Sequence, residues 1–381
     1  MNTNGNDPMS GTDDGTGQES QGYYIFQSPA EETLPDTPVG SAGTEEPGTH
    51  RRFFSHIGLG LLVLAVATNV VAIFATQLLY LLAPDVTRQW WFSWVMSIVP
   101  LYGVGLPLMW LTLRALPKAP RNTLCSVRGR DVPMTRFHFG WWCVLAVIAF
   151  GYMYIGSLLG NGLMSIMSRL VGYDYQNALQ GVISNSPLWA TFLCTVVIAP
   201  LGEELLFRKL LIDRTRRYGD RVSILLSAVF FALFHGNLFQ FFYAFALGLI
   251  LGYLYTRTGK MRWNVGMHAL VNLMGGVYPQ YLISQLDLDA LQSGSTAAIL
   301  DQFAAHPVAM MLYLLQSMLV YAFILAAIVL TVCLFRKVQL GRGEITLPRG
   351  RRFLTVVVNV GMILAVLTCV TLMVINLLPV G

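Results

Sequence analysis

Long apolar stretches recur along most of the sequence, and each approaches the roughly 20 residues that a helix needs to cross a lipid bilayer. Only 12% of the residues are charged and 55% are hydrophobic, whereas about a quarter of an ordinary soluble domain is charged. Polar side chains are therefore too few to cover the surface of a soluble protein of this length. The sequence predicts an all-α polytopic membrane protein, a bundle of about eight to nine transmembrane helices. The expected spans are residues 56–83, 91–113, 140–165, 187–207, 222–240, 239–256, 263–282, 308–335 and 353–379.

The fifth and sixth expected spans abut, so a tight turn is predicted around Gly236 and Asn237. Nine crossings is the expected number. Eight is the main alternative, because the boundary between these two spans is not defined by the apolar pattern alone.

Lysines and arginines lie in alternate connections between the expected spans. Membrane proteins keep their cytoplasmic connections rich in these residues. The segment before the first span and the connections after the second, fourth, sixth and eighth are basic, whereas residues 84–90 and 166–186 are poor in bases and residues 283–307 are acidic. This pattern predicts a multi-pass protein with a cytoplasmic amino terminus. A compact chain without organelle signals fits the cytoplasmic membrane of a bacterium. Because the bases lie in short tracts between spans, nucleic-acid binding is not expected.

Charge also divides the chain into segments. The first 50 residues contain nine of the 20 acidic residues and no lysine or arginine, and such a segment buries too little apolar surface to fold. The five cysteines show no CxxC spacing, which predicts neither a disulfide framework nor a thiolate metal site. The expected segments are a disordered acidic tail at 1–52, two transmembrane helices and a basic loop at 53–138, a main membrane domain at 139–335 with its core at 187–276, and a basic loop with the last transmembrane helix at 336–381.

Ionisable residues inside a bilayer are costly and usually functional. Five stand out: Glu203 and Glu204 toward the inner end of the fourth span with Arg208 directly after it, His235 in the fifth span and His268 in the seventh. Because they are concentrated on three helices, we interpret them as parts of one site.

Spacing along each helix indicates which polar groups face the same way. Glu204 and Arg208 are four residues apart and can form an ion pair. Glu203 points about 100° away from Glu204 and is left free to transfer protons. His268 and Asn272 share one helix face. A purely structural ion pair that joins two helices would use one of the two carboxylates and neither histidine.

The motifs of three known classes of intramembrane protease are absent from the sequence. It contains no HExxH zinc motif, no GxGD motif of the aspartyl type and no GxSx elbow with a suitable histidine. Any hydrolysis therefore has to use glutamate, histidine and asparagine.

The polar residues fall in three short motifs that resemble those of a known family. Residues 203–208 resemble an EExxxR motif, residues 231–235 an FxxxH motif and residues 268–272 an HxxxN motif. The three occur in this order in the CPBP family, which comprises CAAX prenyl endoproteases and bacteriocin-processing or Abi-type membrane proteases. The resemblance covers about residues 140–335, which makes the main membrane domain the catalytic one.

This resemblance implies proteolysis by a glutamate-activated water in an intramembrane polar cavity that opens to the cytoplasm. The roles carried over are general base for Glu203, activation of the water for His235, oxyanion stabilisation for His268 and Asn272, and an ion pair of Arg208 with Glu204. A zinc ion held by His235, His268 and Glu203 and metal-free catalysis are equally compatible with these side chains.

Two other classes of function stay open. A non-catalytic membrane immunity or scaffold protein on the same fold would use the polar residues as structural contacts. A proton-coupled transporter would use them as a relay, but it ranks third because no inverted repeat is visible. The expected partners of the leading candidate, an endopeptidase, are a membrane-associated protein or peptide substrate and the lipid bilayer, with the oligomeric state left open. The pairs Gly156/Gly160 and Gly248/Gly252 are interpreted as helix-packing residues.

Overall fold

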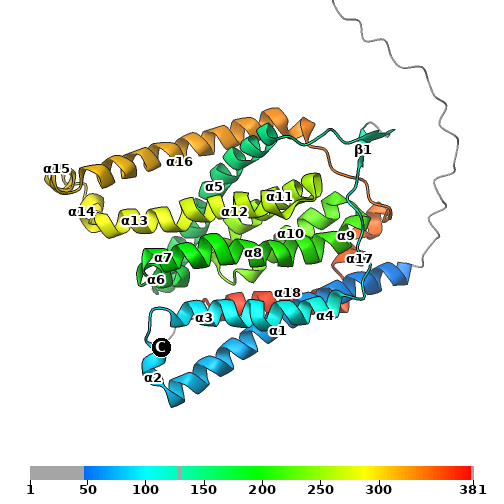
Figure 1. Cartoon of the computed structure of the whole chain (residues 1–381), viewed down its shortest axis with the longest axis horizontal. Helices are drawn as coiled ribbons and strands as arrows, with labels where there is room; N and C mark the ends of the chain where they lie inside the picture. Colours follow the sequence, from blue (N-terminus) through cyan, green and yellow to red (C-terminus); the bar gives the residue numbers. More distant parts are fainter. Residues whose placement is uncertain (1–46, 128–129, 379–381) are drawn as a thin grey trace, which may run out of the picture. The chain divides into compact units, whose positions relative to one another are not determined.

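The computed structural model describes residues 47–127 and 130–378, which all lie in one compact unit of the chain. They form helices and one antiparallel hairpin of strands (Figure 1). The first half contains α1 (Pro47–Leu82), α2 (Pro84–Thr87), α3 (Phe92–Ile98), η1 (Val99–Gly105), α4 (Leu106–Leu113), β1 (Leu124–Val127), β2 (Arg130–Pro133), α5 (Phe139–Val171), α6 (Ala178–Ser184), α7 (Leu188–Thr191), η2 (Phe192–Ile198), α8 (Ala199–Glu204) and η3 (Leu205–Ile212). The second half contains α9 (Asp213–Thr215), η4 (Arg216–Tyr218), α10 (Asp220–Phe234), α11 (Leu238–Thr258), α12 (Met261–Asn272), η5 (Leu273–Val277), α13 (Tyr278–Gln285), α14 (Leu288–Gln292), α15 (Thr296–Ala305), α16 (Pro307–Leu334), η6 (Phe335–Lys337), η7 (Arg349–Arg351), α17 (Arg352–Val356) and α18 (Val360–Ile375).

Six helices in the described ranges are long and apolar enough to cross a membrane. They are Gly48–Leu82, Phe92–Leu113, Phe139–Val171, Leu188–Tyr218, Leu238–Thr258 and Pro307–Lys337. The helical polytopic fold is therefore confirmed. The number of eight to nine crossings stays a prediction, because the helices at the other three expected spans do not meet both conditions.

The predicted acidic tail overlaps the first helix. Because α1 begins at Pro47, residues 47–52 are helical rather than part of a tail. The remainder of the predicted tail, residues 1–46, lies outside the described residues.

Helices α10 and α11 form an antiparallel hairpin that carries part of the predicted site. Gly236, between them, has a φ of 65°, in the left-handed region that favours glycine. Asn237 caps α11, because its Oδ1 accepts a hydrogen bond of 2.9 Å from the backbone N–H of Gln240. The predicted turn at Gly236 and Asn237 is confirmed.

Glycines let two neighbouring helices pack closely against α11. At Gly248 an added Cβ would lie 2.8 Å from the Cα of Ala228 in α10. On the other side, Gly156 of α5 meets the backbone of Tyr243 so closely that no Cβ fits between them. The packing role predicted for the two glycine pairs is confirmed.

Prolines accompany three π-helical segments in the membrane helices. Pro100 is the second residue of η1, while η2 and η5 each end two residues before a proline, Pro200 and Pro279. Proline has no N–H, and its ring clashes with the carbonyl one turn earlier, so the regular α-helical hydrogen bonds are lost. The sequence therefore determines where these helices widen.

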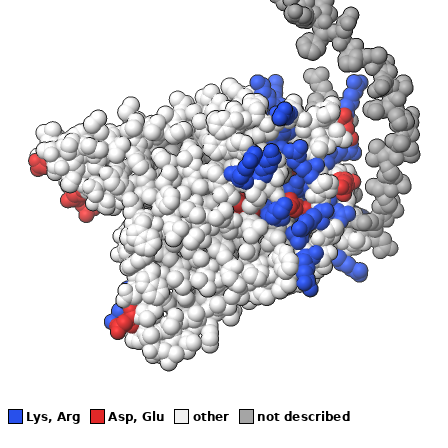
Figure 2. Space-filling model, in the orientation of Figure 1, with Lys and Arg blue, Asp and Glu red and all other residues white. Residues whose placement is uncertain are grey.

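The basic connections meet at one end of the described unit, where Figure 2 shows lysine and arginine side chains gathered. Arg257 donates to Gln339 (3.1 Å) and to the carbonyl of Thr135 (2.6 Å). Asn122 donates to the carboxylate of Asp220 (2.8 Å). These contacts join the connections after the second, fourth, sixth and eighth expected spans. The four basic connections therefore lie at the same end of the helices, as the alternation of basic connections predicts.

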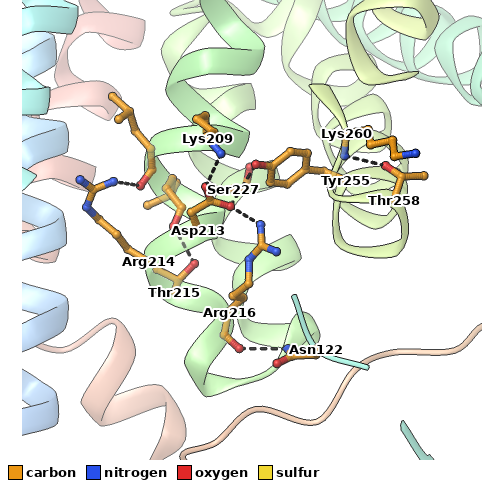
Figure 3. A network of polar contacts seen from close by, with 12 residues as sticks. Asn122, Lys209, Asp213, Arg214, Thr215, Arg216, Ser227, Tyr255, Thr258 and Lys260 are labelled. Atoms are coloured by element: carbon orange, nitrogen blue, oxygen red, sulfur yellow. Dashed lines mark hydrogen bonds and ion pairs between the residues drawn. The ribbon is translucent and has the colours of Figure 1, made fainter. Parts of the chain in front are cut away.

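A polar cluster around Asp213 stabilises the same end (Figure 3). The Asp213 carboxylate pairs with Arg216 and accepts a hydrogen bond of 3.0 Å from the Tyr255 hydroxyl. Arg214 points toward α4 and donates to the carbonyl of Leu113 (2.8 Å). The helix that carries the predicted glutamates is thereby held to both α11 and α4.

The last helix packs against the first and reaches the α10–α11 turn. Gly58 of α1 and Gly361 of α18 let the two backbones touch. Asn376 then donates a hydrogen bond of 2.9 Å to the carbonyl of Gly236. The segment predicted at 336–381 therefore supports the helix hairpin.

Candidate active site

Three structural elements carry the predicted site residues. The helix over residues 188–218 carries Glu203 and Glu204, and α12 carries His268 and packs against α8. His235 directly follows the last residue of α10.

Glu204 is the buried centre of the site. Its side chain and that of Arg208 are both 0% exposed, and the Arg208 Nε lies 3.2 Å from the Glu204 Oε2. Asn264 Nδ2 donates to the same oxygen (3.0 Å), and His268 Nδ1 lies 3.0 Å from Oε1. A buried carboxylate needs such partners to remain charged. The predicted pairing of Glu204 with Arg208 is confirmed.

The ring of Phe231 in α10 packs against three of the polar groups. The guanidinium carbon of Arg208 lies 4.6 Å from the ring centroid, a cation–π contact. The rings of His235 and His268 stand edge-on to it, at centroid distances of 5.0 and 5.7 Å. Phe231 therefore brings an apolar surface between the two histidines.

Glu203 has a different environment from its neighbour. Its side chain is 20% exposed and lies 3.6 Å, Oε2 to Nε2, from His268. That Oε2 atom is buried and accepts no hydrogen bond from the residues the structure describes. Glu203 thus has the free acceptor that a general base requires.

Hydrogen bonds determine which ring nitrogens of the two histidines are available. A carbonyl oxygen only accepts, so Nδ1 of His235 donates to the carbonyl of Phe231 (2.7 Å) and Nε2 is left as an acceptor. In His268, Nδ1 faces Glu204 and Nε2 faces Glu203. In both rings Nδ1 is engaged by the protein, so Nε2 is the nitrogen that can interact with a water molecule or a substrate.

Asn272 links α12 to the helix of the glutamates. In η2 each carbonyl faces the backbone N–H five residues later, as in the bond from the N–H of Ala199 to the carbonyl of Cys194. The carbonyl of Thr195 therefore faces residue 200. Residue 200 is proline and has no N–H to donate. The Asn272 amide instead donates to the Thr195 carbonyl (2.8 Å). One of its two N–H protons is therefore already in use.

Asn264 belongs to the site although the sequence analysis missed it. It is fully buried and donates to Glu204 (3.0 Å) and to the carbonyl of Leu251 (2.7 Å). It lies four residues before His268, as Asn272 lies four residues after it. This repeated spacing on one helix face was the signal that could have revealed it.

Replacement of Asn264 by leucine is expected to lower the free energy of unfolding by about 1–3 kcal/mol, because the buried Glu204 loses a donor. Asn161→Leu is the matched control, since Asn161 is exposed and its amide donates to the carbonyl of Ser157 in its own helix. The control is expected to change stability by less than about 0.5 kcal/mol. Denaturant unfolding of the purified variants measures both, and equal effects would contradict the assigned role of Asn264.

The residues as placed do not fit the zinc site that the sequence left open. Zinc ligands surround one point at about 2.0–2.3 Å. Over the described part of the chain, no three His, Cys, Asp or Glu side chains are grouped so that they could hold a metal ion. His235 and His268 stand against the same Phe231 ring, and Nδ1 of His268 is bonded to Glu204.

Fold and site define a multi-pass membrane protein with the side chains of a hydrolase. Residues 185–274, which contain all three motifs, match the family model described as Type II CAAX prenyl endopeptidase Rce1-like. The predicted resemblance is thereby confirmed, and it supports a CAAX-type intramembrane protease at the level of the family. No curated protein and no solved structure gives a significant match.

Proposed function

We propose that this protein is an intramembrane endopeptidase that cleaves a membrane-associated protein or peptide. The environment of Glu203 carries the proposal: the carboxylate is partly exposed and has a free acceptor 3.6 Å from Nε2 of His268. The neighbouring Glu204 is fully occupied by Arg208, His268 and Asn264. Two adjacent glutamates thus have separate tasks, one in proton transfer and one in holding His268 in place.

The chemistry assigns one step to each group. Glu203 takes a proton from a water molecule, and the water oxygen bonds to the carbonyl carbon of the peptide bond. His235 orients this water through Nε2. His268, as an imidazolium whose Nδ1–H is held by Glu204, donates through Nε2 to the oxyanion that forms, and the remaining N–H of Asn272 donates to it as well. The C–N bond then breaks, and the proton held by Glu203 passes to the leaving nitrogen.

The proposed setting is the cytoplasmic membrane of a bacterium, with the amino terminus and the basic end of the protein in the cytoplasm. The clustering of lysine and arginine at one end supports this orientation (Figure 2). Peptide processing is the proposed activity in that membrane, and the site opens toward the cytoplasm.

The test compares membranes that contain equal amounts of wild type or the Glu203→Gln variant. Mass spectrometry of newly formed peptide termini is expected to find a set of cleavage sites that is present with wild type and missing with Glu203→Gln. Glu344→Gln is the matched control, since Glu344 is exposed and lies in the basic connection after α16. It is expected to reproduce the wild-type termini.

The family also includes inactive members, so a failure to detect cleavage would point to a non-catalytic role. Termini that are the same with wild type, with Glu203→Gln and without the protein would contradict the peptidase proposal. They would favour a non-catalytic immunity or scaffold role, in which the Glu204–Arg208 pair is structural.

A further inference from the structure

A row of three polar side chains begins at the α10–α11 turn and ends beside the candidate site. Asn237, the cap of α11, is followed at three-residue spacing by Gln240 and Tyr243 on the first turns of the helix. Asn237 Nδ2 donates to Gln240 Oε1 (2.7 Å), and Gln240 Nε2 donates to the Tyr243 hydroxyl (2.6 Å). Neither the sequence motifs nor the proposed mechanism uses these three residues.

Two backbone groups determine the direction of every hydrogen bond in the row. The N–H of Gln240 can only donate, and it bonds to Oδ1 of Asn237 (2.9 Å). The carbonyl of His235 can only accept, and it bonds to Nδ2 of Asn237 (2.9 Å). Asn237 therefore presents a donor to Gln240, so Gln240 presents its amide oxygen to Asn237 and its NH₂ group to Tyr243.

The Tyr243 hydroxyl must consequently accept from Gln240, which leaves its own proton free to donate elsewhere. The ring of Tyr243 lies edge-on to His235 at a centroid distance of 6.3 Å. The side chain that carries the free proton thus stands beside His235, the residue that the proposed mechanism uses to orient the water.

The position of Tyr243 is also set from the opposite side. Gly156 of α5 touches its backbone, and any side chain at residue 156 would push α11 away. Gln240 is buried, with 7% of its surface exposed, so its amide cannot turn freely into solvent. A donor whose direction and position are both predetermined has the properties of an oxyanion-hole group.

We propose that the Tyr243 hydroxyl is a further catalytic group, which donates a hydrogen bond to the oxyanion formed during peptide hydrolysis. Asn237 and Gln240 are positioning residues that keep its proton directed at the site. The inference rests on the proposed peptidase function. The Tyr243 hydroxyl would supplement Asn272, which has only one side-chain N–H left for the oxyanion because the other is bonded to the Thr195 carbonyl.

The kinetic test uses purified protein and a peptide that spans a bond cleaved by wild type in the terminal profiling. Tyr243→Phe is expected to lower kcat by about 10²-fold or more, with KM nearly unchanged because the interaction forms in the transition state. Tyr253→Phe on the same helix is the matched control and is expected to keep the wild-type kcat. A Tyr243→Phe variant with wild-type kcat would overturn the inference.

Two substitutions of Gln240 separate the effect of hydrogen-bond direction at the Tyr243 hydroxyl from the effect of side-chain packing at residue 240. In Gln240→Glu both side-chain oxygens accept, so the Tyr243 hydroxyl turns its proton toward residue 240 and kcat falls as far as in Tyr243→Phe. Gln240→Met leaves the proton free, and most of the activity is expected to remain. Equal losses in these two variants would show that Gln240 acts through packing alone and would contradict the directed-donor proposal.

An infrared measurement tests the placement without any substrate. The phenol C–O stretching band of Tyr243 is identified by its absence in Tyr243→Phe. The band is expected to shift in both Gln240→Glu and Glu203→Gln, and an unchanged band in Glu203→Gln would overturn the placement of this hydroxyl. If Glu203→Gln stays active in the kinetic assay, the proposed function fails. If only Tyr243→Phe stays active, this inference alone fails.

Discussion

Glu203→Gln is expected to lower kcat for peptide hydrolysis by about 10²–10⁴-fold, because a positioned general base contributes this much. The variant keeps the shape of the side chain but cannot accept a proton. Glu203 takes part in no ion pair with a lysine or arginine in the described ranges, so unfolding of the variant should match that of wild type. Steady-state kinetics and denaturant unfolding on the same purified samples check both statements.

The loss of kcat has to be specific to the Glu203 carboxylate. Glu344→Gln removes an exposed glutamate, and kcat is expected to stay at the wild-type value. Cleavage by Glu203→Gln at the wild-type rate would refute the assignment of Glu203 as the base. A large drop in the stability of Glu203→Gln would instead place Glu203 among the structural residues.

Arg208→Met is expected to lower the free energy of unfolding by about 3–5 kcal/mol, because it leaves the buried Glu204 carboxylate without its cation. Both side chains are 0% exposed and 3.2 Å apart, so water cannot replace the lost partner. The methionine fills much of the space next to Phe231, which limits the contribution of a cavity. Denaturant unfolding in detergent measures the effect.

The double variant Arg208→Met/Glu204→Gln separates charge from packing. Removal of both partners of a buried pair is often close to neutral, so the double variant is expected to be more stable than Arg208→Met alone. The matched control is Arg342→Met, which breaks an exposed ion pair with Asp131 and should cost no more than about 1 kcal/mol. Equal costs at residues 208 and 342 would contradict the buried-pair account.

Much of the fold follows from local sequence patterns. The apolar stretches locate the helices, and the residues at the α10–α11 turn locate the reversal, because glycine takes the left-handed φ there and Asn237 caps the next helix. The Glu204–Arg208 pair also follows from spacing, since four residues bring both side chains to one face. Each of these features depends on residues that are close in the chain.

Other parts of the site depend on contacts across the bundle. Asn264 and His268 both reach Glu204, about 60 residues earlier in the chain. The link from Asn272 to Thr195 needs both the carbonyl left free by Pro200 and the register of α12 against η2. No local pattern specifies that register, so the long-range bonds of Asn264 and Asn272 were not predicted.

By itself, the sequence determined the membrane class, the helix hairpin and the identity of the chemical groups, because hydropathy, turn residues and motif spacing act over a few helical turns. Only the tertiary structure decided that Glu204 is fully partnered while Glu203 keeps a free oxygen. It also decided that the Tyr243 hydroxyl accepts a hydrogen bond from Gln240, which leaves the hydroxyl proton free to donate. The physical reason is that hydrogen-bond direction and burial depend on neighbouring helices, whose register is set by glycine contacts and packing throughout the bundle.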